Sequence, residues 1–168
     1  MEAREELQHA TLIYKMVCKT LDDRNWEYEK DDEKLLINTT VRGEDLPMSL
    51  LINISTEKEL VTFGSVLPFD VPAKSIEAIA IATCMVNDVI TYGHFDYDIT
   101  KGLLYFTITT CYVDSILSTE LFDRIIDTLC YTVDKFNDKF LIITKLKVDS
   151  IEKIAEILSS DNGDDDDE

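Results

Sequence analysis

Between residues 26 and 67 the chain repeats one pattern, in which short segments of alternating apolar and polar residues are separated by turn-forming residues. The clearest segment is 48–55, where every second residue is Met, Leu or Ile. Alternation with a period of two predicts strands with one buried and one exposed face, and short connections make sequential strands antiparallel. The sequence therefore predicts a four-strand meander. The expected strands span 26–29, 34–41, 48–55 and 60–67.

Helical periodicity precedes and follows this meander. From residue 3 to 23 apolar residues recur every three or four positions, which predicts an amphipathic helix. Pro72 stands where a second helix is expected to begin, since proline is favoured at the first helical position. Residues 73–90 are apolar nearly all round, and this pattern predicts a helix that is buried on most sides and forms the core of the domain.

The second half of the chain predicts a hairpin and two more helices. Residues 94–98 and 103–112 read as strands, with Gly102 supplying the positive φ of a short turn. Ser118 or Thr119 is expected to cap a long helix through about residue 136, and Ser150 a short last one. Residues 140–146 either extend the long helix or break it, and the sequence leaves both possibilities open.

The order of elements is helix, four strands, helix, two strands and two helices. Antiparallel strands with helices before, between and after them are typical of the α+β class, here an antiparallel sheet packed against helices. The length of 168 residues predicts one domain, expected to span 1–148. A short C-terminal helix is expected at 149–160, followed at 161–168 by an acidic tail that we expect to be disordered.

Charge is the unusual feature of the composition. The chain has 34 Asp and Glu against 16 Lys and Arg, a formal net charge of −18. Such a surface repels nucleic-acid backbones and anionic membrane surfaces, so neither is an expected partner. No apolar run reaches the length of a membrane span, and the charged first residues show no secretory signal.

Four cysteines stand alone in apolar stretches, at positions 18, 84, 111 and 130. Their separation excludes a Cys-x-x-Cys redox motif or half of a zinc site, and buried free thiols are the expectation. Free thiols are typical of proteins in a reducing compartment, so the sequence predicts a cytoplasmic location.

Three short motifs, taken in this order, resemble the YbjN-like proteins and the wider type III secretion chaperone-like fold. They are Leu67-Pro68-Phe69-Asp70-Val71-Pro72, then Val86-Asn87-Asp88 followed by Tyr92-Gly93-His94-Phe95-Asp96, and finally Asp98-Ile99-Thr100-Lys101-Gly102 running into Leu104-Tyr105-Phe106. The resemblance covers roughly residues 5 to 140. It implies a small acidic cytoplasmic protein, often dimeric, that acts by binding other proteins. It supplies no catalytic residue and no cofactor.

The helix expected at 119–136 carries two adjacent apolar stripes, more than one contact needs. In one interpretation the stripes pack on the sheet and under the last helix. In the other, part of the surface forms a dimer seam or a groove for a partner segment, basic or amphipathic in character. The unpaired edge of the meander is a second place where a partner strand could add. The candidate partner-binding residues are Leu121, Phe122, Ile125, Ile126, Leu129 and Val133.

Two other functions remain as alternatives. Asp96 and Asp98 match the Asp-x-Asp-x-Thr pattern of metal-dependent phosphotransferases, but the residues before them do not form an apolar strand, and Gly102 predicts a hairpin instead of a crossover helix. A regulator that encloses a small ligand between sheet and helices is the other alternative. His9 and His94 lack partners at the spacing of a triad or metal site, so no catalytic, cofactor or metal residue is assigned.

Overall fold

The computed structural model describes residues 2–115, 117–146, 148 and 150–160. The helices are α1 (Glu2–Asp23), the short 3-10 helix η1 (Ala73–Ser75), α2 (Ile76–Val89), α3 (Thr119–Lys145) and α4 (Ile151–Ser159). The strands are β1 (Glu29–Asp31), β2 (Leu36–Arg42), β3 (Pro47–Ser55), β4 (Leu60–Asp70), β5 (His94–Asp98) and β6 (Leu103–Cys111).

All six strands form one antiparallel sheet in the order β1-β2-β3-β4-β6-β5. The meander and the hairpin are thus joined through β4 and β6, and the predicted α+β architecture is confirmed. The first strand is shorter than predicted and begins at Glu29. The backbone N–H of Trp26 bonds to the carbonyl of Leu21, and Asn25 adopts φ 56°, so residues 24–26 close the end of α1 instead of pairing in the sheet.

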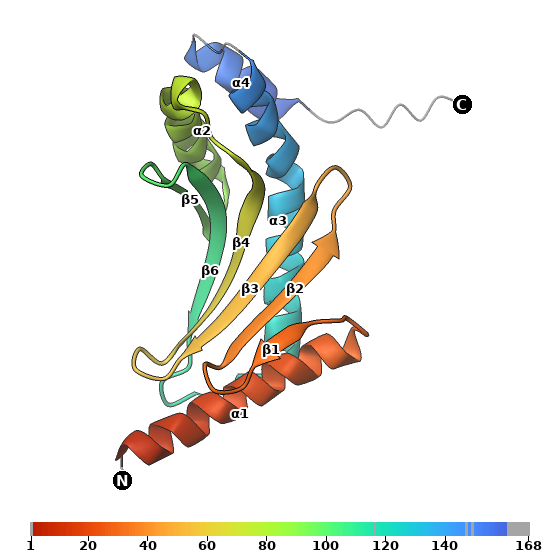
Figure 1. Cartoon of the computed structure of the whole chain (residues 1–168), viewed down its shortest axis with the longest axis vertical. Coiled ribbons are helices and arrows are strands. Elements are labelled where there is room, and N and C mark those ends of the chain that lie inside the picture. The colour runs from red at the N-terminus through yellow and green to blue at the C-terminus, as the bar shows by residue number, and fades with distance from the viewer. Residues whose placement is uncertain (1, 116, 147, 149, 161–168) are drawn as a thin grey trace, which may run out of the picture.

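The helices cover one face of the sheet only (Figure 1). Helix α3 runs behind the strands, α1 crosses one end of the molecule, and α2 and α4 lie at the other end. Residues 140–145 belong to α3, so this segment extends the long helix instead of breaking it. The predicted caps are confirmed, because Ser118 accepts a hydrogen bond from Leu121 N and Ser150 accepts one from Lys153 N.

The core lies between the inner face of the sheet and α3. Its aromatic centre is Phe95 of β5, whose ring centroid lies 4.8 Å from that of Phe106 and 5.1 Å from that of Phe140. The edge of Phe136 completes the cluster from the same helix. Each buried ring or branched aliphatic side chain contributes about 2 kcal/mol of hydrophobic free energy, so this layer supplies much of the stability.

Helix α2 is not buried on most sides, and that prediction was wrong. Only one face of the helix is buried, against β5, α3 and α4. The other face exposes small and large apolar side chains, because α3 occupies the centre of the sheet and leaves α2 at its end. The exposed apolar residues are Ala80, Ile81, Cys84 and Val89.

The cysteines are free, but burial was the wrong expectation for two of them. Cys84 on α2 and Cys111 at the end of β6 are exposed, whereas Cys18 and Cys130 are partly buried. Cys84 belongs to the uncovered face of α2, and Cys111 falls on the outer face of the sheet, so both lie on apolar stretches that no element covers. The tail at 161–168 lies outside the described residues.

Gly93, in the turn before β5, provides a test of this packing. Its φ is +90°, and an added Cβ would lie 2.5 Å from Phe106 Cζ and 2.7 Å from Ile108 Cγ1. Gly93→Ala should therefore lower the free energy of unfolding by about 2–3 kcal/mol, because it combines backbone strain with overpacking. Urea denaturation measures the change.

Gly64→Ala is the matched control. An added Cβ on Gly64 would lie 3.8 Å from its nearest neighbours, the carbonyl oxygens of Leu51 and Phe106, which is ordinary van der Waals contact. The variant should stay within about 0.5 kcal/mol of the parent protein. Equal destabilisation by both substitutions would contradict the packing described around β5.

Candidate functional site

The structure places the predicted partner-binding residues of α3 in the core. Phe122, Ile125, Ile126, Leu129 and Val133 are buried against the sheet and α1, and Leu121 alone is partly exposed. Their burial within a single chain favours the interpretation in which both stripes pack internally. A partner could reach five of the six only if the core opened, so an accessible surface has to be sought elsewhere.

The outer face of the sheet is such a surface, because none of the helices in the described part of the chain covers it (Figure 1). Strand pairing brings its side chains into continuous rows: Leu51 of β3 lies beside Gly64 of β4, which lies beside Thr107 of β6. In the next row Val66 pairs with Tyr105. We call the following set the outer sheet face. It comprises Asn38, Thr40, Ser49, Leu51, Asn53, Thr62, Gly64, Val66, Tyr105, Thr107 and Thr109.

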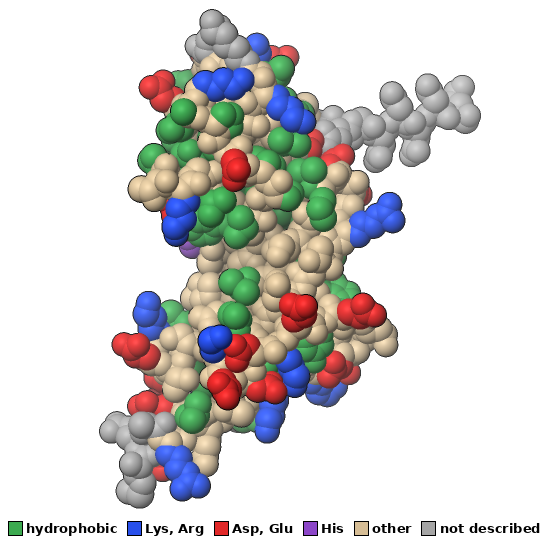
Figure 2. Space-filling model, in the orientation of Figure 1, with side chains coloured by type: hydrophobic (Ala, Val, Ile, Leu, Met, Phe, Trp, Pro, Cys, Tyr) green, Lys and Arg blue, Asp and Glu red, His purple; other side chains and the backbone are tan. Residues whose placement is uncertain are grey.

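None of these described residues is charged, although 34 of the 168 residues of the chain are acidic. Two of them are exposed hydrophobic residues: Leu51 is 46% exposed and Val66 is 45% exposed. Figure 2 shows the same view in space-filling form, with a narrow, largely uncharged middle and charged side chains above and below it. A surface without charge can bury a partner segment without the desolvation cost that a carboxylate imposes.

Acidic residues frame this face along both edge strands. On β1, Glu29 and Asp31 flank β2, and on β5, Asp96 and Asp98 flank β6. His94 lies beside Asp96, with 2.9 Å between Nε2 and Oδ2. The face therefore combines an uncharged centre with rims whose acids are partly paired, since Asp31 pairs with Lys34 and Asp98 with Lys101. The remaining acidic charge is complementary to an uncharged segment with basic flanks.

The edge of β5 is closed to strand addition by a side chain of α2. Asn87 Nδ2 donates to the carbonyl of Phe95 at 2.8 Å, and Phe95 N donates to Asn87 Oδ1 at 2.8 Å. In an antiparallel strand the N–H and C=O of one residue point to the same side, so the amide of Asn87 occupies the outward pair as a neighbouring strand would. The opposite edge, β1, has three residues, all charged, which also opposes pairing.

Asp96 and Asp98 do not form a phosphotransferase site in this geometry. They lie on an antiparallel edge strand, and Asp98 Oδ1 accepts hydrogen bonds from Thr100 N, Thr100 Oγ1 and Lys101 N. These bonds, that from the Thr100 side chain first, hold the pKa of Asp98 at about 2. Asp98, the second carboxylate of the pattern, is thus held in the turn and is not free to act as the general acid, while Asp96, the expected nucleophile, lies beside His94 on the edge strand.

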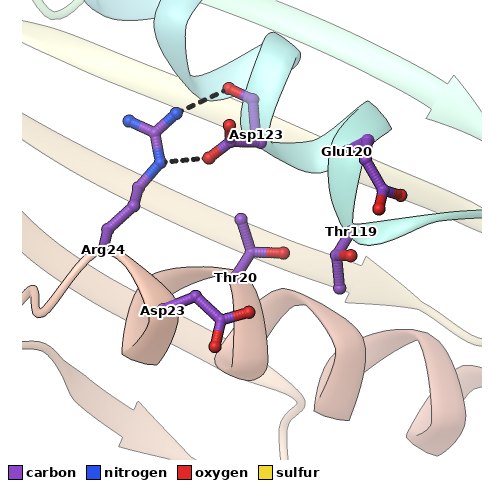
Figure 3. A pocket seen from close by; sticks show the side chains of 6 residues that line it. All are labelled: Thr20, Asp23, Arg24, Thr119, Glu120 and Asp123. Atoms are coloured by element: carbon purple, nitrogen blue, oxygen red, sulfur yellow. Dashed lines mark hydrogen bonds and ion pairs between the residues drawn. The ribbon is translucent and has the colours of Figure 1, made fainter.

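A hollow between α1 and α3 is lined by Thr20, Asp23, Arg24, Thr119, Glu120 and Asp123 (Figure 3). Arg24 Nε donates to Asp123 Oδ1 at 2.5 Å, its Nη2 donates to Asp127 Oδ1 at 2.7 Å, and the guanidinium lies over the Trp26 ring. Burial opposes the charge on Arg24, but the bonds to Asp127 and Asp123 outweigh it, and the pKa of Arg24 is raised. The guanidinium thus ties α1 to α3, a structural role.

Among the described residues, no group of three or more His, Cys, Asp or Glu side chains is arranged to hold a metal ion. His9 bonds through Nε2 to the carbonyl of Ser115 at 3.2 Å and packs edge-on against Tyr112. Helices long and apolar enough to cross a membrane are absent from the described part of the chain.

Sequence reasoning missed the outer sheet face and the role of Asn87. The signal for the face was present in the strand 48–55, whose polar positions are Ser49, Asn53 and Ser55, with no charged residue among them. Asn87 and Phe95 both belong to the second motif that carried the family resemblance, but the sequence did not show that the two bond, because a loop whose path depends on the fold separates them.

A family model named YbjN, described as a "putative bacterial sensory transduction regulator", matches residues 14–141 of this chain. The crystal structure of YbjN, described as a putative transcription regulator from E. coli, aligns with 74% of this chain and 91% of its own, with a TM-score of 0.54 and 10% identity. The crystal structure of the ExsC–ExsE complex aligns over 77% of this chain and 93% of its own, with the same TM-score and identity. Among curated protein sequences none matches. These similarities confirm the predicted chaperone-like fold.

Replacement of Asn87 tests the closure of the β5 edge. Asn87→Ala removes both bonds to Phe95 and leaves a donor and an acceptor unpaired on the edge. We expect the free energy of unfolding to fall by about 1–3 kcal/mol and the amide of Phe95 to exchange faster with solvent. Hydrogen exchange followed by NMR measures the second effect.

The control is Asp88→Ala, at the next position of α2, where the side chain is exposed. It should leave the exchange rate at Phe95 unchanged. Protection at Phe95 that persists in Asn87→Ala would show that the edge is closed by something other than this side chain.

Proposed function

This chain belongs to the YbjN family, and we propose that it is a non-enzymatic protein-binding domain, regulatory or chaperone-like, that holds a partner segment on the outer sheet face. The observation that carries the proposal is the absence of charge among the described residues of that face, in a chain with a net charge of −18. Arg42 lies on the same side of β2 but at the strand end, beside Pro47, so the charge-free part of the face is the centre of the four strands.

The chemistry of the surface defines the partner. The exposed side chains of Leu51 and Val66 provide apolar anchors, and the Ser, Thr and Asn side chains around them offer hydrogen bonds. The acidic rims on β1 and β5 attract basic residues on either side of the bound segment. An amphipathic or extended segment with small uncharged residues and basic flanks satisfies all three features.

The mode of binding follows from the closed edges. Because Asn87 occupies the outward groups of Phe95 and β1 is short and charged, a partner strand does not add readily to either edge. The partner instead lies across the face of the sheet, as the second layer that a half-covered antiparallel sheet lacks.

Neither alternative function has comparable support. Asp98 is engaged in its turn and unavailable as a general acid, which disfavours phosphotransfer, and the hollows beside Arg24, along α1 and beside Tyr28 are open at the surface instead of enclosing a ligand. The proposal includes a reducing cytoplasmic compartment, because Cys84 and Cys111 are exposed free thiols that an oxidising environment would pair.

We also propose a homodimer, formed through the uncovered face of α2. Ile81, Cys84 and Val89 are exposed on this helix, with Val89 70% exposed, and they surround the exposed acids Glu77 and Asp88. Exposed apolar side chains with polar residues among them are typical of subunit contacts. The dimer would leave the outer sheet face of each subunit free to bind a partner.

The double variant Leu51→Glu, Val66→Glu tests the outer sheet face. Two carboxylates at its centre should weaken partner binding at least about tenfold, because they would be buried without a counter-charge. The tagged chain is used to capture partners from its native cells, and mass spectrometry quantifies a stoichiometric partner. Circular dichroism should show an unchanged fold, since both side chains are exposed.

Tyr131→Glu is the matched control, since it places a carboxylate at a 68% exposed apolar position on α3, away from the sheet. It should leave capture unchanged. A partner that stays bound to the double variant as tightly as to the parent chain would exclude the outer sheet face as its site.

The substitution Ile81→Asp tests the dimer. A carboxylate on α2 should convert the protein to a monomer in sedimentation analysis, with little change in stability because the side chain is 37% exposed. Val113→Asp, at a 44% exposed position in the loop after β6, should remain dimeric. A parent chain that sediments as a monomer at every concentration would refute the dimer.

A further inference from the structure

We propose that α1 carries a second docking surface, which binds an acidic segment of a partner protein through lysines and two exposed leucines. We call this surface the α1 groove, and its principal residues are Arg4, Leu7, Thr11, Leu12, Lys15 and Lys19. It shares no residue with the outer sheet face, and it accepts a segment of the opposite charge.

The sequence of α1 is unusual for this chain. Residues 7–21 contain no Asp or Glu, although the chain has 34 acidic residues, and they contain two lysines. Both lysines are exposed, so the missing acids are not explained by burial of this part of the helix. Lys15 and Lys19 therefore stand in an acid-free stretch of the helix, with Glu5 and Glu6 before it and Asp22 and Asp23 after it.

Two hollows run along this helix and share Thr11 and Lys15. The first has a volume of about 470 Å³ and is lined by residues of α1 alone, between Arg4 and Lys15, with no acid among them. The second has a volume of about 290 Å³ and lies between α1 and the β1–β2 turn. The first is a shallow, open depression on the helix surface, and it adjoins the second at Thr11 and Lys15.

The charges along the groove favour an anionic occupant. Its lining carries Arg4, Lys15, Lys19 and Lys30 against Asp22 and Asp32. Both acids already accept hydrogen bonds from tyrosines: Tyr28 Oη donates to Asp22 at 3.0 Å and Tyr14 Oη donates to Asp32 at 2.8 Å.

Lys15 is the cation most available to a ligand. Lys19 bonds to Asp23 at 2.5 Å and Lys30 lies 3.3 Å from Asp32, whereas Lys15 forms no ion pair with a described residue. It also lies at the junction of the two hollows. A carboxylate of a bound segment can reach its ammonium without displacing an existing pair.

Leu7 and Leu12 add an apolar component. Each is 52% exposed, and both line the first hollow. A nucleic-acid backbone has no apolar side chains to place against the leucines, and the net charge of −18 opposes any anionic partner, so only a short segment that contacts both the lysines and the leucines is favoured. A short peptide that alternates carboxylates with apolar side chains matches both components, and this is the occupant that we assign.

Fluorescence anisotropy with a labelled peptide tests the assignment. The probe is a twelve-residue peptide that repeats Glu-Leu-Asp, and the control probe repeats Gln-Leu-Asn. We expect the full-length chain to bind the acidic probe at least about tenfold more tightly than the neutral one, with affinity falling as salt rises. Equal affinity for both probes would refute an electrostatic site.

Variants then locate the site. Lys15→Glu should weaken binding of the acidic probe about tenfold or more, whereas Lys74→Glu, an equal change of charge at an exposed position before α2, should change it less than about twofold. Equal losses in the two variants would mean that net charge alone governs binding, and the α1 groove would be excluded.

The same probe separates this inference from the proposed function. The variant Leu51→Glu, Val66→Glu should bind the acidic probe as the parent chain does, and amide shifts on binding should fall on residues 4–19. Shifts confined to β3, β4 and β6 would instead assign the acidic segment to the outer sheet face and overturn this proposal, whatever the outcome for the other partner.

Discussion

The packing of α3 against one face of the sheet is the contact on which the rest of the structure depends. A six-stranded antiparallel sheet buries its apolar face only if something covers it, and the two apolar stripes of α3 do so along 27 residues. Arg24 fixes α1 at one end of this helix through Asp123 and Asp127, and α2 and α4 pack at the other end. A single long helix thus buries the inner face of the sheet, and no other described element covers the outer face.

The main property of the outer sheet face is the lack of charged residues at its centre. The described positions at its centre carry no charged residue, and the charged residues lie along its edges. The centre of the face is therefore neutral although the chain as a whole is strongly negative. The edges are protected at the same time, by Asn87 on β5 and by the short charged β1. Such an arrangement presents a sheet face to partners while opposing edge-to-edge association between copies of the chain.

The sequence predicted much of the fold and little of the candidate site. Alternation placed the strands, and serines at 118 and 150 predicted helix starts that the structure confirms. The same periodicity correctly showed that the helix at 119–136 had a wide apolar surface, but periodicity does not specify what covers such a surface. In the structure the sheet and α1 cover it, and apolar residues are accessible elsewhere, among them Leu51 and Val66 on the sheet and Ile81 and Val89 on α2.

Local interactions explain what the sequence determined by itself: strand alternation, helix periodicity, the caps, and the turn at Gly102, whose φ of +69° only glycine adopts easily. These features depend on neighbours within a few positions. Tertiary structure decided which apolar faces are shared between elements and which remain exposed, because that depends on contacts between residues far apart in the chain. The bonds of Asn87 to Phe95 and of Arg24 to Asp123 exist only once those elements are docked. For the same reason α2, apolar on nearly all sides in the sequence, is covered on only one.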